Sequence, residues 1–317
     1  MEVDYLRISV TDKCNLRCVY CHPPSGCDLI DRKEILRLEE IHRIAKLFAQ
    51  CGITKVRLTG GEPLVRRNIV YLVRELAAIA GIKDLSLTTN GVLLGQMAAE
   101  LKQAGLKRVN VSVDSAQRDS YKQITGFDLL SKATEGIYKA IEVGLEPVKI
   151  NSVIIKGINV SQILPLAQMS LHLPAVVRFI EYCPTSKYTR PASDYVPNNE
   201  VRRTIEGRFG PLSPVLTRAS NGPALYFKIK NSAGTIGFIN GRSSTFCRSC
   251  NRLRLTSDGK LKPCLYSAYS YDLKKLIRSQ MSDRKLLNQL KKIISQKSNY
   301  TKLNSFTEEF SMRKVGG

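Results

Sequence analysis

The first two-thirds of the chain alternates two hydrophobic patterns, short β-rich runs and longer segments with apolar residues at helical spacing. The short runs predict strands at Leu6–Val10, Lys55–Thr59, Leu85–Thr88, Arg108–Val113, Val148–Ile155 and Val176–Glu181. The longer segments predict helices at Leu38–Cys51, Ile69–Ile79, Leu94–Ala104, Leu130–Val143 and Ser161–Leu171. Strands that alternate with helices in this way predict right-handed βαβ units and a parallel sheet.

Six such units fall short of the eight that close a TIM barrel. We therefore expect an α/β fold in which residues 1–184 form an open, six-unit (β/α)6 partial TIM barrel. Barrels of this type carry their chemistry at the carboxyl ends of the strands. The sequence accordingly directs attention to the residues that follow each predicted strand.

The pattern changes after Pro184, where a loop-like region rich in Pro, Ser and Asn begins. Short strand-like runs that alternate like antiparallel strands then follow, and Ser257–Lys260 has the composition of a hairpin turn. The elements predicted in this region are a short helix around Glu200–Arg208, strands at Leu225–Lys230, Thr235–Ile239 and Arg252–Thr256, and a basic helical stretch around Tyr271–Ser295. We expect residues 185–317 to form a smaller α+β domain that covers the open side of the barrel.

Two cysteine triads, one near each end of the chain, are the strongest indication of chemistry. The first, C-x3-C-x2-C, follows the first predicted strand and consists of Cys14, Cys18 and Cys21. The second, C-x2-C-x13-C, consists of Cys247, Cys250 and Cys264. Each triad is one ligand short of the four that close a structural zinc site or an ordinary iron–sulfur cluster. A [4Fe–4S] cluster held by three cysteines leaves one iron open, so two such clusters predict a catalytic arrangement. The alternative at the first triad is a zinc knuckle completed by His22 or Cys27.

A second motif supports the first triad. After the predicted strand at Lys55–Thr59 comes Gly60-Gly61-Glu62-Pro63, a turn whose glycines let backbone approach a ligand. Together, the triad and this turn resemble the radical S-adenosylmethionine (SAM) enzymes. The resemblance implies that the open iron binds the amino and carboxylate groups of SAM and that SAM is cleaved to a 5′-deoxyadenosyl radical. It also places Tyr20 and Gly61 at SAM-contact positions.

Charge and composition narrow the alternatives. The chain has 49 Lys and Arg against 27 Asp and Glu, a net charge of +22, which invites a nucleic-acid interpretation. No RNA-binding module is visible and Trp is absent, so we expect an anionic small substrate and no nucleic-acid partner. No run approaches the ~20 apolar residues of a membrane span, and no signal peptide is visible. Nine cysteines, mostly in ligand-like spacings, are typical of a reducing compartment, so we expect a cytoplasmic protein without membrane contact.

The residues after Cys250 indicate a phosphate-bearing substrate. Arg252 and Arg254 point to the same side of the predicted strand, and guanidinium groups bind phosphate oxygens in pairs. The run Cys250-Asn-Arg-Leu-Arg-Leu-Thr, together with the first triad and the terminal Gly316-Gly317, closely resembles the radical SAM GTP 3′,8-cyclases of molybdenum cofactor biosynthesis. This resemblance covers essentially the whole chain.

The resemblance implies two [4Fe–4S] clusters, SAM as cofactor and GTP as substrate, with the purine bound at the second cluster. A hydrogen atom is taken from the ribose C3′, and the carbon radical attacks C8 of guanine to give 3′,8-cyclo-7,8-dihydro-GTP. Implied catalytic positions are Arg7, Arg252, Arg254, Gly316 and Gly317. Implied SAM contacts are Tyr20, Gly61, Ser112 and Cys183. Implied GTP contacts are Arg7, Arg57, Thr88, Lys149, Arg252, Leu253 and Arg254.

The same resemblance implies partners: a cyclic pyranopterin monophosphate synthase that uses the product, and a reductant such as flavodoxin or ferredoxin. The sequence leaves open whether two copies of the chain form a homodimer. Cys183 departs from the family, which usually has methionine at this SAM contact. Two other functions are kept as alternatives: a radical SAM peptide-modifying or maturase enzyme with an auxiliary cluster, and a non-catalytic iron–sulfur or zinc RNA-binding protein.

Overall fold

The computed structural model describes residues 3–21, 29–183, 191–215, 223–243, 250–267, 269–279, 281–297 and 315–316. Four residues singled out above lie outside these ranges: His22, Cys27, Cys247 and Gly317. The predicted domain boundary between residues 184 and 185 also lies outside them. Within the described ranges, no helix is long and apolar enough to cross a membrane.

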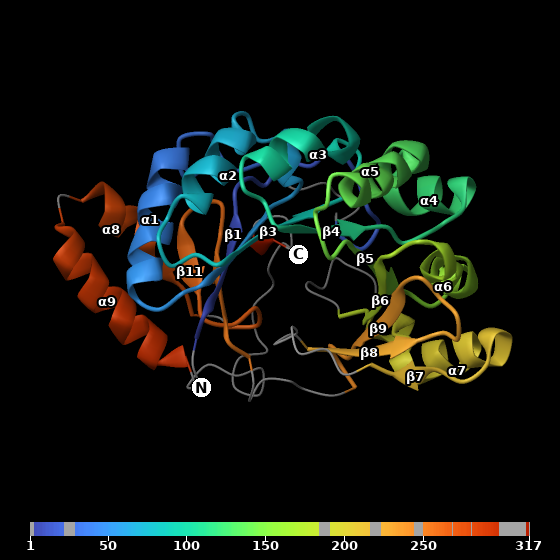
Figure 1. The fold of residues 1–317 in the computed structure, drawn as a ribbon. Helices are drawn as coiled ribbons and strands as arrows, with labels where there is room; N and C mark the ends of the chain where they lie inside the picture. Colours follow the sequence, from blue (N-terminus) through green and yellow to red (C-terminus); the bar gives the residue numbers. More distant parts are fainter. Residues whose placement is uncertain are drawn as a thin grey trace.

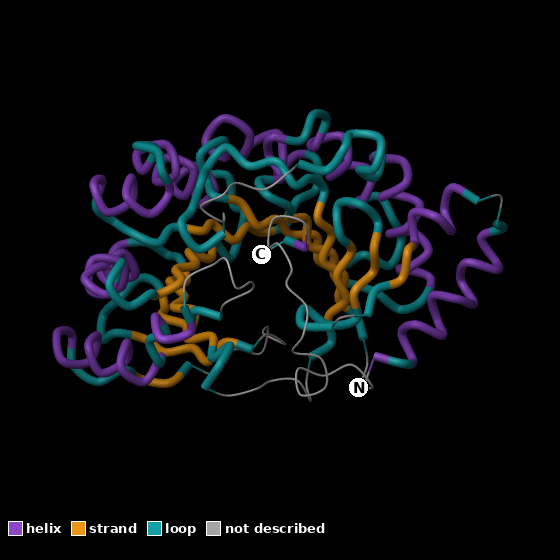
Figure 2. The backbone as a smooth tube through the Cα atoms, turned by 180° about the vertical axis from the view of Figure 1, so that it is seen from behind, coloured by secondary structure: helices purple, strands orange, loops and turns teal. Residues whose placement is uncertain are grey.

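One curved sheet organises the described residues. Its order is β12-β11-β10-β1-β2-β3-β4-β5-β6-β9-β8-β7, and the eight neighbours from β10 to β9 run parallel. The strands are β1 (Tyr5–Ser9), β2 (Lys55–Thr59), β3 (Asp84–Thr89), β4 (Arg108–Ser112), β5 (Lys149–Ile154), β6 (Val176–Glu181), β7 (Ser213–Pro214), β8 (Ala224–Lys228), β9 (Thr235–Ile239), β10 (Arg252–Leu255), β11 (Lys260–Lys262) and β12 (Tyr271–Asp272). Figures 1 and 2 show that these strands form an arch.

The helices lie on the convex side of the arch (Figure 2). They are α1 (Leu38–Gln50), α2 (Ile69–Ala77), α3 (Leu94–Gln103), α4 (Arg118–Thr125), α5 (Leu130–Glu142), α6 (Ile163–His172), α7 (Asn198–Phe209), α8 (Leu273–Arg278) and α9 (Asp283–Ser295), with short 3-10 turns at Pro63–Val65, Val160–Gln162 and Ala192–Asp194. The end of the chain lies inside the arch in both views. The concave side is therefore the place where a substrate and the chain terminus can meet.

The two faces of the sheet differ because strand side chains alternate between them. Register pairs place a continuous apolar row on the convex face, and every member is at most 2% exposed: Leu253, Leu6, Val56, Leu85, Leu58, Leu87, Val109, Val111, Ile150, Val177 and Ile236. This row packs under the helices and forms the main hydrophobic core. The other face carries the polar members of the same strands.

The predicted fold class is confirmed: six β/α units form an open partial barrel, followed by C-terminal antiparallel strands. The structure adds how those later strands attach. β10 pairs with β1 and β9 pairs with β6, both in parallel, so the C-terminal strands extend both edges of the barrel sheet. The hairpin turn at Ser257–Lys260 joins β10 and β11, where Gly259 has a φ of +84° and its amide donates to the Thr256 carbonyl.

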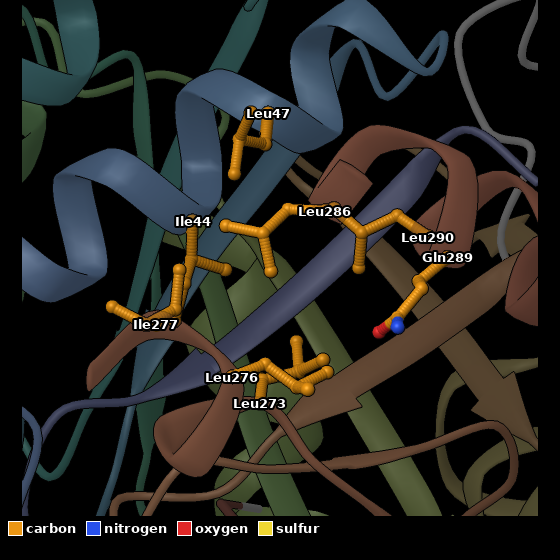
Figure 3. Close-up of a pocket in the computed structure, with 8 residues that line it drawn as sticks. All are labelled: Ile44, Leu47, Leu273, Leu276, Ile277, Leu286, Gln289 and Leu290. Carbon is orange, nitrogen blue, oxygen red and sulfur yellow. The ribbon is translucent and has the colours of Figure 1, made fainter. Parts of the chain in front are cut away.

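The observed helices differ from the predicted ones at two places. No helix was predicted at α4, where the only buried residues are Tyr121, Ile124 and Thr125. The basic stretch predicted as one helical region around Tyr271–Ser295 is divided among β12, α8 and α9. The division brings α8 and α9 back over α1, where their leucines and isoleucines surround a small apolar pocket (Figure 3). Arg43 of α1 holds this corner by donating to the carbonyls of Ile277 and Met281.

Candidate active site

A basic wall lines the concave face of the sheet. Arg254 Nη1 donates to the carbonyl of Gly316, which lies inside the arch, so the Arg254 side of β10 is the inner side (2.9 Å). Residues paired in register point to the same side of the sheet. Arg7 is paired with both Arg254 and Arg57, and the pairing continues strand by strand to β6, so the inner side can be followed across the sheet. The basic residues of this wall include Arg252, Arg254, Arg7, Arg57, Arg108, Lys149 and Arg178.

Residues of the wall are buried to a large extent, and their positive charges repel one another. Arg7 is 8% exposed and Arg254 7% exposed. Burial, followed by the charge of Arg254, holds the pKa of Arg7 well below its usual range. Burial and the neighbouring Arg252 lower the pKa of Arg254 to about 10. Burial, with Arg178, Arg108 and Arg57, lowers the pKa of Lys149 to about 7. An anion placed against this wall would relieve both the desolvation and the repulsion.

Polar neighbours fix the direction of the wall side chains at the β4–β6 end. Arg178 Nε donates to Asn151 Oδ1 (2.8 Å) and its Nη2 donates to Asn110 Oδ1 (2.7 Å). A Cβ on Gly237, the register partner of Arg178, would lie 2.8 Å from the Arg178 Cγ. The glycine therefore makes room for the guanidinium, whose pKa burial lowers to about 10.

The first cysteine triad lies on the loop after β1, at the carboxyl ends of the strands. Two backbone bonds fasten this loop to the turn after β2: Gly61 N donates to the Thr11 carbonyl (2.7 Å) and Glu62 N to the Lys13 carbonyl (2.8 Å). A Cβ on Gly61 would lie 2.3 Å from the Lys13 carbonyl oxygen. The second glycine of the Gly-Gly-Glu-Pro turn is thus required for the two loops to pack.

Side chains that directly follow β3 and β4 also hold the first triad. Asn90 Nδ2 donates to Asn15 Oδ1 (2.7 Å) and contacts the Cys14 sulfur (3.9 Å). Tyr20 donates through its hydroxyl to Asp114 Oδ2 (2.5 Å), while Asp114 Oδ1 accepts from the Val153 amide. Burial raises the pKa of Asp114 to about 6.

The end of α4 supports the same loop from the side. The amides of Arg17 and Val19 donate to the carbonyls of Thr125 and Ile124, at 2.8 Å and 3.0 Å. The helix that the sequence did not predict is thus part of the support of the triad.

The donor set of this loop is three thiols, which fits a [4Fe–4S] cluster that keeps one iron open. Burial, followed by Asp114, Cys21 and Cys14, raises the pKa of the Cys18 thiol, so the three thiols lie within electrostatic reach of one another. The residues that could complete a zinc site instead, His22 and Cys27, lie outside the described ranges.

The two described cysteines of the second triad lie at the opposite end of the strands. Cys250 lies two residues before the start of β10 and Cys264 two residues after the end of β11, and these strands form an antiparallel hairpin. Both thiols act on the pKa of Arg254 and on that of Lys297, so both lie beside the wall. The start of β10 is in register with Tyr5, and β1 ends four residues later at Ser9, which is roughly 13 Å along the strand. The two cysteine sites therefore face the concave space from opposite ends.

Glu181, at the end of β6, fixes the segment that leads into the second triad. Its carboxylate accepts from the amides of Arg242 (2.9 Å) and Ser243 (2.8 Å), and from the Ser243 hydroxyl (2.6 Å). It also accepts from the Asn198 amide (3.1 Å) and the Tyr195 hydroxyl (3.2 Å). The sequence analysis did not select Glu181, because a carboxylate in a strand gives no sign of its partners.

Val315 and Gly316, close to the end of the chain, lie against the inner side of the barrel. Val315 is 3% exposed, and Gly316 has a φ of +80°. A Cβ on Gly316 would lie 2.3 Å from the Thr59 Cγ2 at the end of β2. Any other residue would meet both the backbone strain and this contact.

The structure brings together most of the residues selected from the sequence. Thr88 and Ser112 share the inner side with the basic wall, at its carboxyl end. Cys183 lies just beyond β6, where a Cβ on Gly241 would lie 3.0 Å from its sulfur. Leu253 differs, because its side chain is 0% exposed in the core on the convex face, so only its backbone could meet a ligand.

The wall also contains residues that were not predicted as site residues, among them Tyr5, Arg108 and Arg178. For Arg108 and Arg178 the signal was present, because each alternates with apolar neighbours in a predicted strand and therefore points away from the apolar face. Tyr5 lies one residue before the first predicted strand, Leu6–Val10.

Comparisons with known proteins agree with this geometry. Residues 8–169 match the Radical SAM superfamily, and residues 175–303 match the family described as Molybdenum Cofactor Synthesis C. A GTP 3′,8-cyclase of Pelotomaculum thermopropionicum is 46% identical, with 100% of this chain and 98% of the relative covered. A GTP 3′,8-cyclase of Moorella thermoacetica is 44% identical, with the same two shares covered.

The similar solved structures show the fold alone. Streptococcus suis SuiB bound to S-adenosylmethionine superposes with a TM-score of 0.62 at 16% identity, covering 92% of this chain and 68% of SuiB. Radical SAM enzymes use a [4Fe–4S] cluster and SAM, which agrees with the donor set of the first triad. The full-length identity to the cyclases is far higher, and the chain therefore belongs to the radical SAM superfamily and, within it, to the GTP 3′,8-cyclase family.

Proposed function

We propose that this protein converts GTP to 3′,8-cyclo-7,8-dihydro-GTP, the first step of molybdenum cofactor biosynthesis. The observation that carries the proposal is the basic wall, which is buried and lies between two cysteine sites at opposite ends of one barrel. A nucleoside triphosphate has the charge that this wall needs and the length to extend along it. Membership in the GTP 3′,8-cyclase family supports the same substrate.

The first triad holds the cluster that binds SAM. Cys14, Cys18 and Cys21 are its ligands, and the bonds from Gly61 and Glu62 keep their loop against the β2 turn. Bound together, this cluster and SAM supply the 5′-deoxyadenosyl radical that takes a hydrogen atom from the ribose C3′ of GTP. The residues that bind SAM are Tyr20, Gly61, Ser112 and Cys183.

The second triad holds a second [4Fe–4S] cluster, with Cys247, Cys250 and Cys264 as ligands. Cys250 and Cys264 lie beside Arg252 and Arg254, so the purine binds at this end of the wall. The phosphates then extend across the sheet, away from β10 and toward β6. The residues that bind GTP are Arg7, Arg57, Thr88, Lys149, Arg178, Arg252, Arg254 and the backbone of Leu253.

The remaining residues exclude water and fix positions. Gly316 lies where a side chain would not fit beside Thr59, and Arg254 fixes it through the Gly316 carbonyl. Gly317 continues this tail as the second implied catalytic glycine. Holding two ligands in one dry space is what radical chemistry requires, because a primary radical reacts with any nearby C–H bond. A downstream synthase would use the product, and a low-potential protein would supply the electron.

The test uses anaerobically reconstituted protein, a strong reductant and SAM, with and without GTP. We expect 5′-deoxyadenosine to form in a GTP-dependent way, together with a cyclised guanosine triphosphate. SAM cleavage that is indifferent to GTP and yields no nucleotide product would contradict the proposed substrate and favour a peptide-modifying enzyme. Intact clusters without any cleavage would contradict the enzyme function itself.

A further inference from the structure

Arg108 stands at the start of β4 on the inner side of the sheet, within the basic wall. A carboxylate from the neighbouring strand fixes its guanidinium: Nε donates to Asp84 Oδ1 (2.9 Å) and Nη2 donates to Asp84 Oδ2 (2.6 Å). The Arg108 side chain is 15% exposed. Two parallel bonds of this kind hold the guanidinium plane in one orientation.

One nitrogen of this guanidinium has no partner. Arg108 Nη1 is buried and makes no hydrogen bond to any described residue. A buried charged donor without an acceptor costs free energy, and the Asp84 fork prevents the group from turning to find one. The orientation is therefore maintained although it leaves a donor unsatisfied.

The surroundings of Arg108 are those of a site for an anion. Arg57 lies on the same side two strands away, and Ser86 stands between them in register, so a short side chain leaves the space between the two guanidiniums open. Arg57 Nε donates to that Ser86 hydroxyl (3.2 Å). Lys149 follows on the next strand, and Arg108 is one of the charges that lower its pKa.

A second donor nearby is also unsatisfied. The hydroxyl of Tyr5 is buried without a hydrogen-bond partner among the described residues, and the Arg57 guanidinium carbon lies 5.3 Å from the centroid of its ring. Tyr5 and Arg108 therefore leave buried donors on both sides of Arg57. Two such donors in one cluster of cations indicate a missing acceptor of high charge.

We propose that Arg108 is a substrate-binding residue whose Nη1 donates to an oxygen of the GTP triphosphate, and that Asp84 is the positioning residue that aims it. This inference rests on the proposed function. Because Arg108 lies toward β6, away from Cys250 and Cys264, its contact involves the phosphates and not the guanosine. Arg108 therefore contributes to preference for the triphosphate and little to recognition of the base.

The variant Arg108→Lys distinguishes a directed hydrogen bond to the phosphate from the effect of a positive charge alone. A lysine keeps the positive charge and can pair with Asp84, but it cannot bond Asp84 twice and reach the ligand with a third nitrogen. The matched control is Arg118→Lys, because Arg118 also donates through Nε and Nη2 to one aspartate, here to the single oxygen Oδ2 of Asp128, and its side chain is 77% exposed. Thermal melting of both variants would establish that they fold.

The experiment measures the dissociation constants of GTP and of guanosine by calorimetry on the anaerobically reconstituted protein. We expect Arg108→Lys to weaken GTP binding about 10- to 100-fold and to leave guanosine binding within about twofold. Arg118→Lys should change neither. If Arg108→Lys does not fold, the double variant D84N/R108Q replaces the ion pair with a neutral hydrogen-bonded pair, and the same selective loss is expected.

Two outcomes would overturn the inference in distinguishable ways. Wild-type protein that binds GTP no better than guanosine would overturn the proposed function and the role of Arg108 with it. Wild-type protein that prefers GTP, with Arg108→Lys equal to it within about twofold, would overturn the role of Arg108 alone. An equal loss of GTP and guanosine would also contradict it, because it would indicate a structural defect.

Discussion

The two faces of the same sheet carry opposite kinds of residue. On the convex face, Ile150 and its register partners are apolar and fully buried under helices. On the concave face, the adjacent Lys149 belongs to a wall of cations, and burial lowers its pKa to about 7. The convex face therefore stabilises the folded protein, whereas repulsion between cations on the concave face destabilises it in the absence of a bound anion.

This contrast shows how an active site of one charge sign can exist inside a small domain. Burial of apolar side chains on the convex face stabilises the folded protein, and this offsets the destabilising repulsion between the cations on the concave face. A ligand that binds only the folded protein adds stability of its own. The two faces should thus respond to mutation in different measurements, the convex one in unfolding and the concave one in binding.

Replacement of Ile150 by alanine should have the largest effect on stability. The Ile150 side chain projects from β5 toward the helices and is 0% exposed, so truncation removes buried contacts and leaves a cavity. We expect the free energy of unfolding to fall by about 2–5 kcal/mol, measured by chemical denaturation of the apo protein. GTP affinity of the fraction that remains folded should be nearly unchanged. A loss below ~0.5 kcal/mol would contradict the role of the convex row.

Replacement of the neighbouring Lys149 by methionine should do the reverse. Methionine keeps most of the apolar stem and removes the ammonium, whose nitrogen lies 5.9 Å from the centroid of the Tyr226 ring and whose charge burial disfavours. We expect unfolding free energy to stay equal or rise by about 1–2 kcal/mol. GTP affinity should fall about 10- to 100-fold. A variant that loses stability while it keeps GTP affinity would reverse the assignment of the two faces.

The apolar half of this contrast could be predicted from the sequence, and much of the polar half could not. The convex residues lie in short runs, such as Val109-Asn110-Val111, whose period locates both strand and core. The predicted strands β2 and β6 match the observed bounds. Cysteine spacing likewise selected Cys14, Cys18 and Cys21 as candidate cluster ligands, a prediction that experiment has still to test.

Other features depend on partners that are distant in sequence. Nothing local to Arg108 reveals that Asp84 holds it. Likewise, nothing local to Glu181 reveals its five donors, which all come from residues 195 to 243. The attachment of β10 beside β1 joins residues about 250 apart in sequence, and no periodic pattern encodes that pairing. Alternation in strands could have marked Arg178 and Arg108, once the inner side was known.

GTP affinity should depend on pH through Lys149, a smaller effect than its removal. The folded pKa of about 7 lies below the ordinary lysine value because of burial and of Arg178, Arg108 and Arg57, with Asp84 opposing them. Below pH 7 the ammonium is already charged, whereas above it GTP binding must take up a proton. We expect affinity to fall as pH rises from 7 to 9, by at most about tenfold per unit.

The measurement is calorimetry in buffers of different ionisation enthalpy, which reports proton uptake on binding. The terminal phosphate of GTP does not interfere at these values, because such a phosphate ionises near pH ~6. The Lys149→Met variant is the control and should show neither the uptake nor the decline. A wild-type protein with a flat profile from pH 7 to 9 would contradict a neutral Lys149 in the free protein.

Removal of a cation from the outer surface should have the smallest effect. Arg118 pairs with Asp128, but its side chain is 77% exposed and lies on α4, outside the wall. An exposed ion pair contributes about 0–1 kcal/mol, so Arg118→Ala should leave the melting temperature and GTP affinity almost unchanged. Calorimetry at low and physiological salt checks this, because screening acts on surface charges more than on buried ones. A marked loss of affinity would mean that the overall charge of +22, and not the buried wall, attracts the substrate.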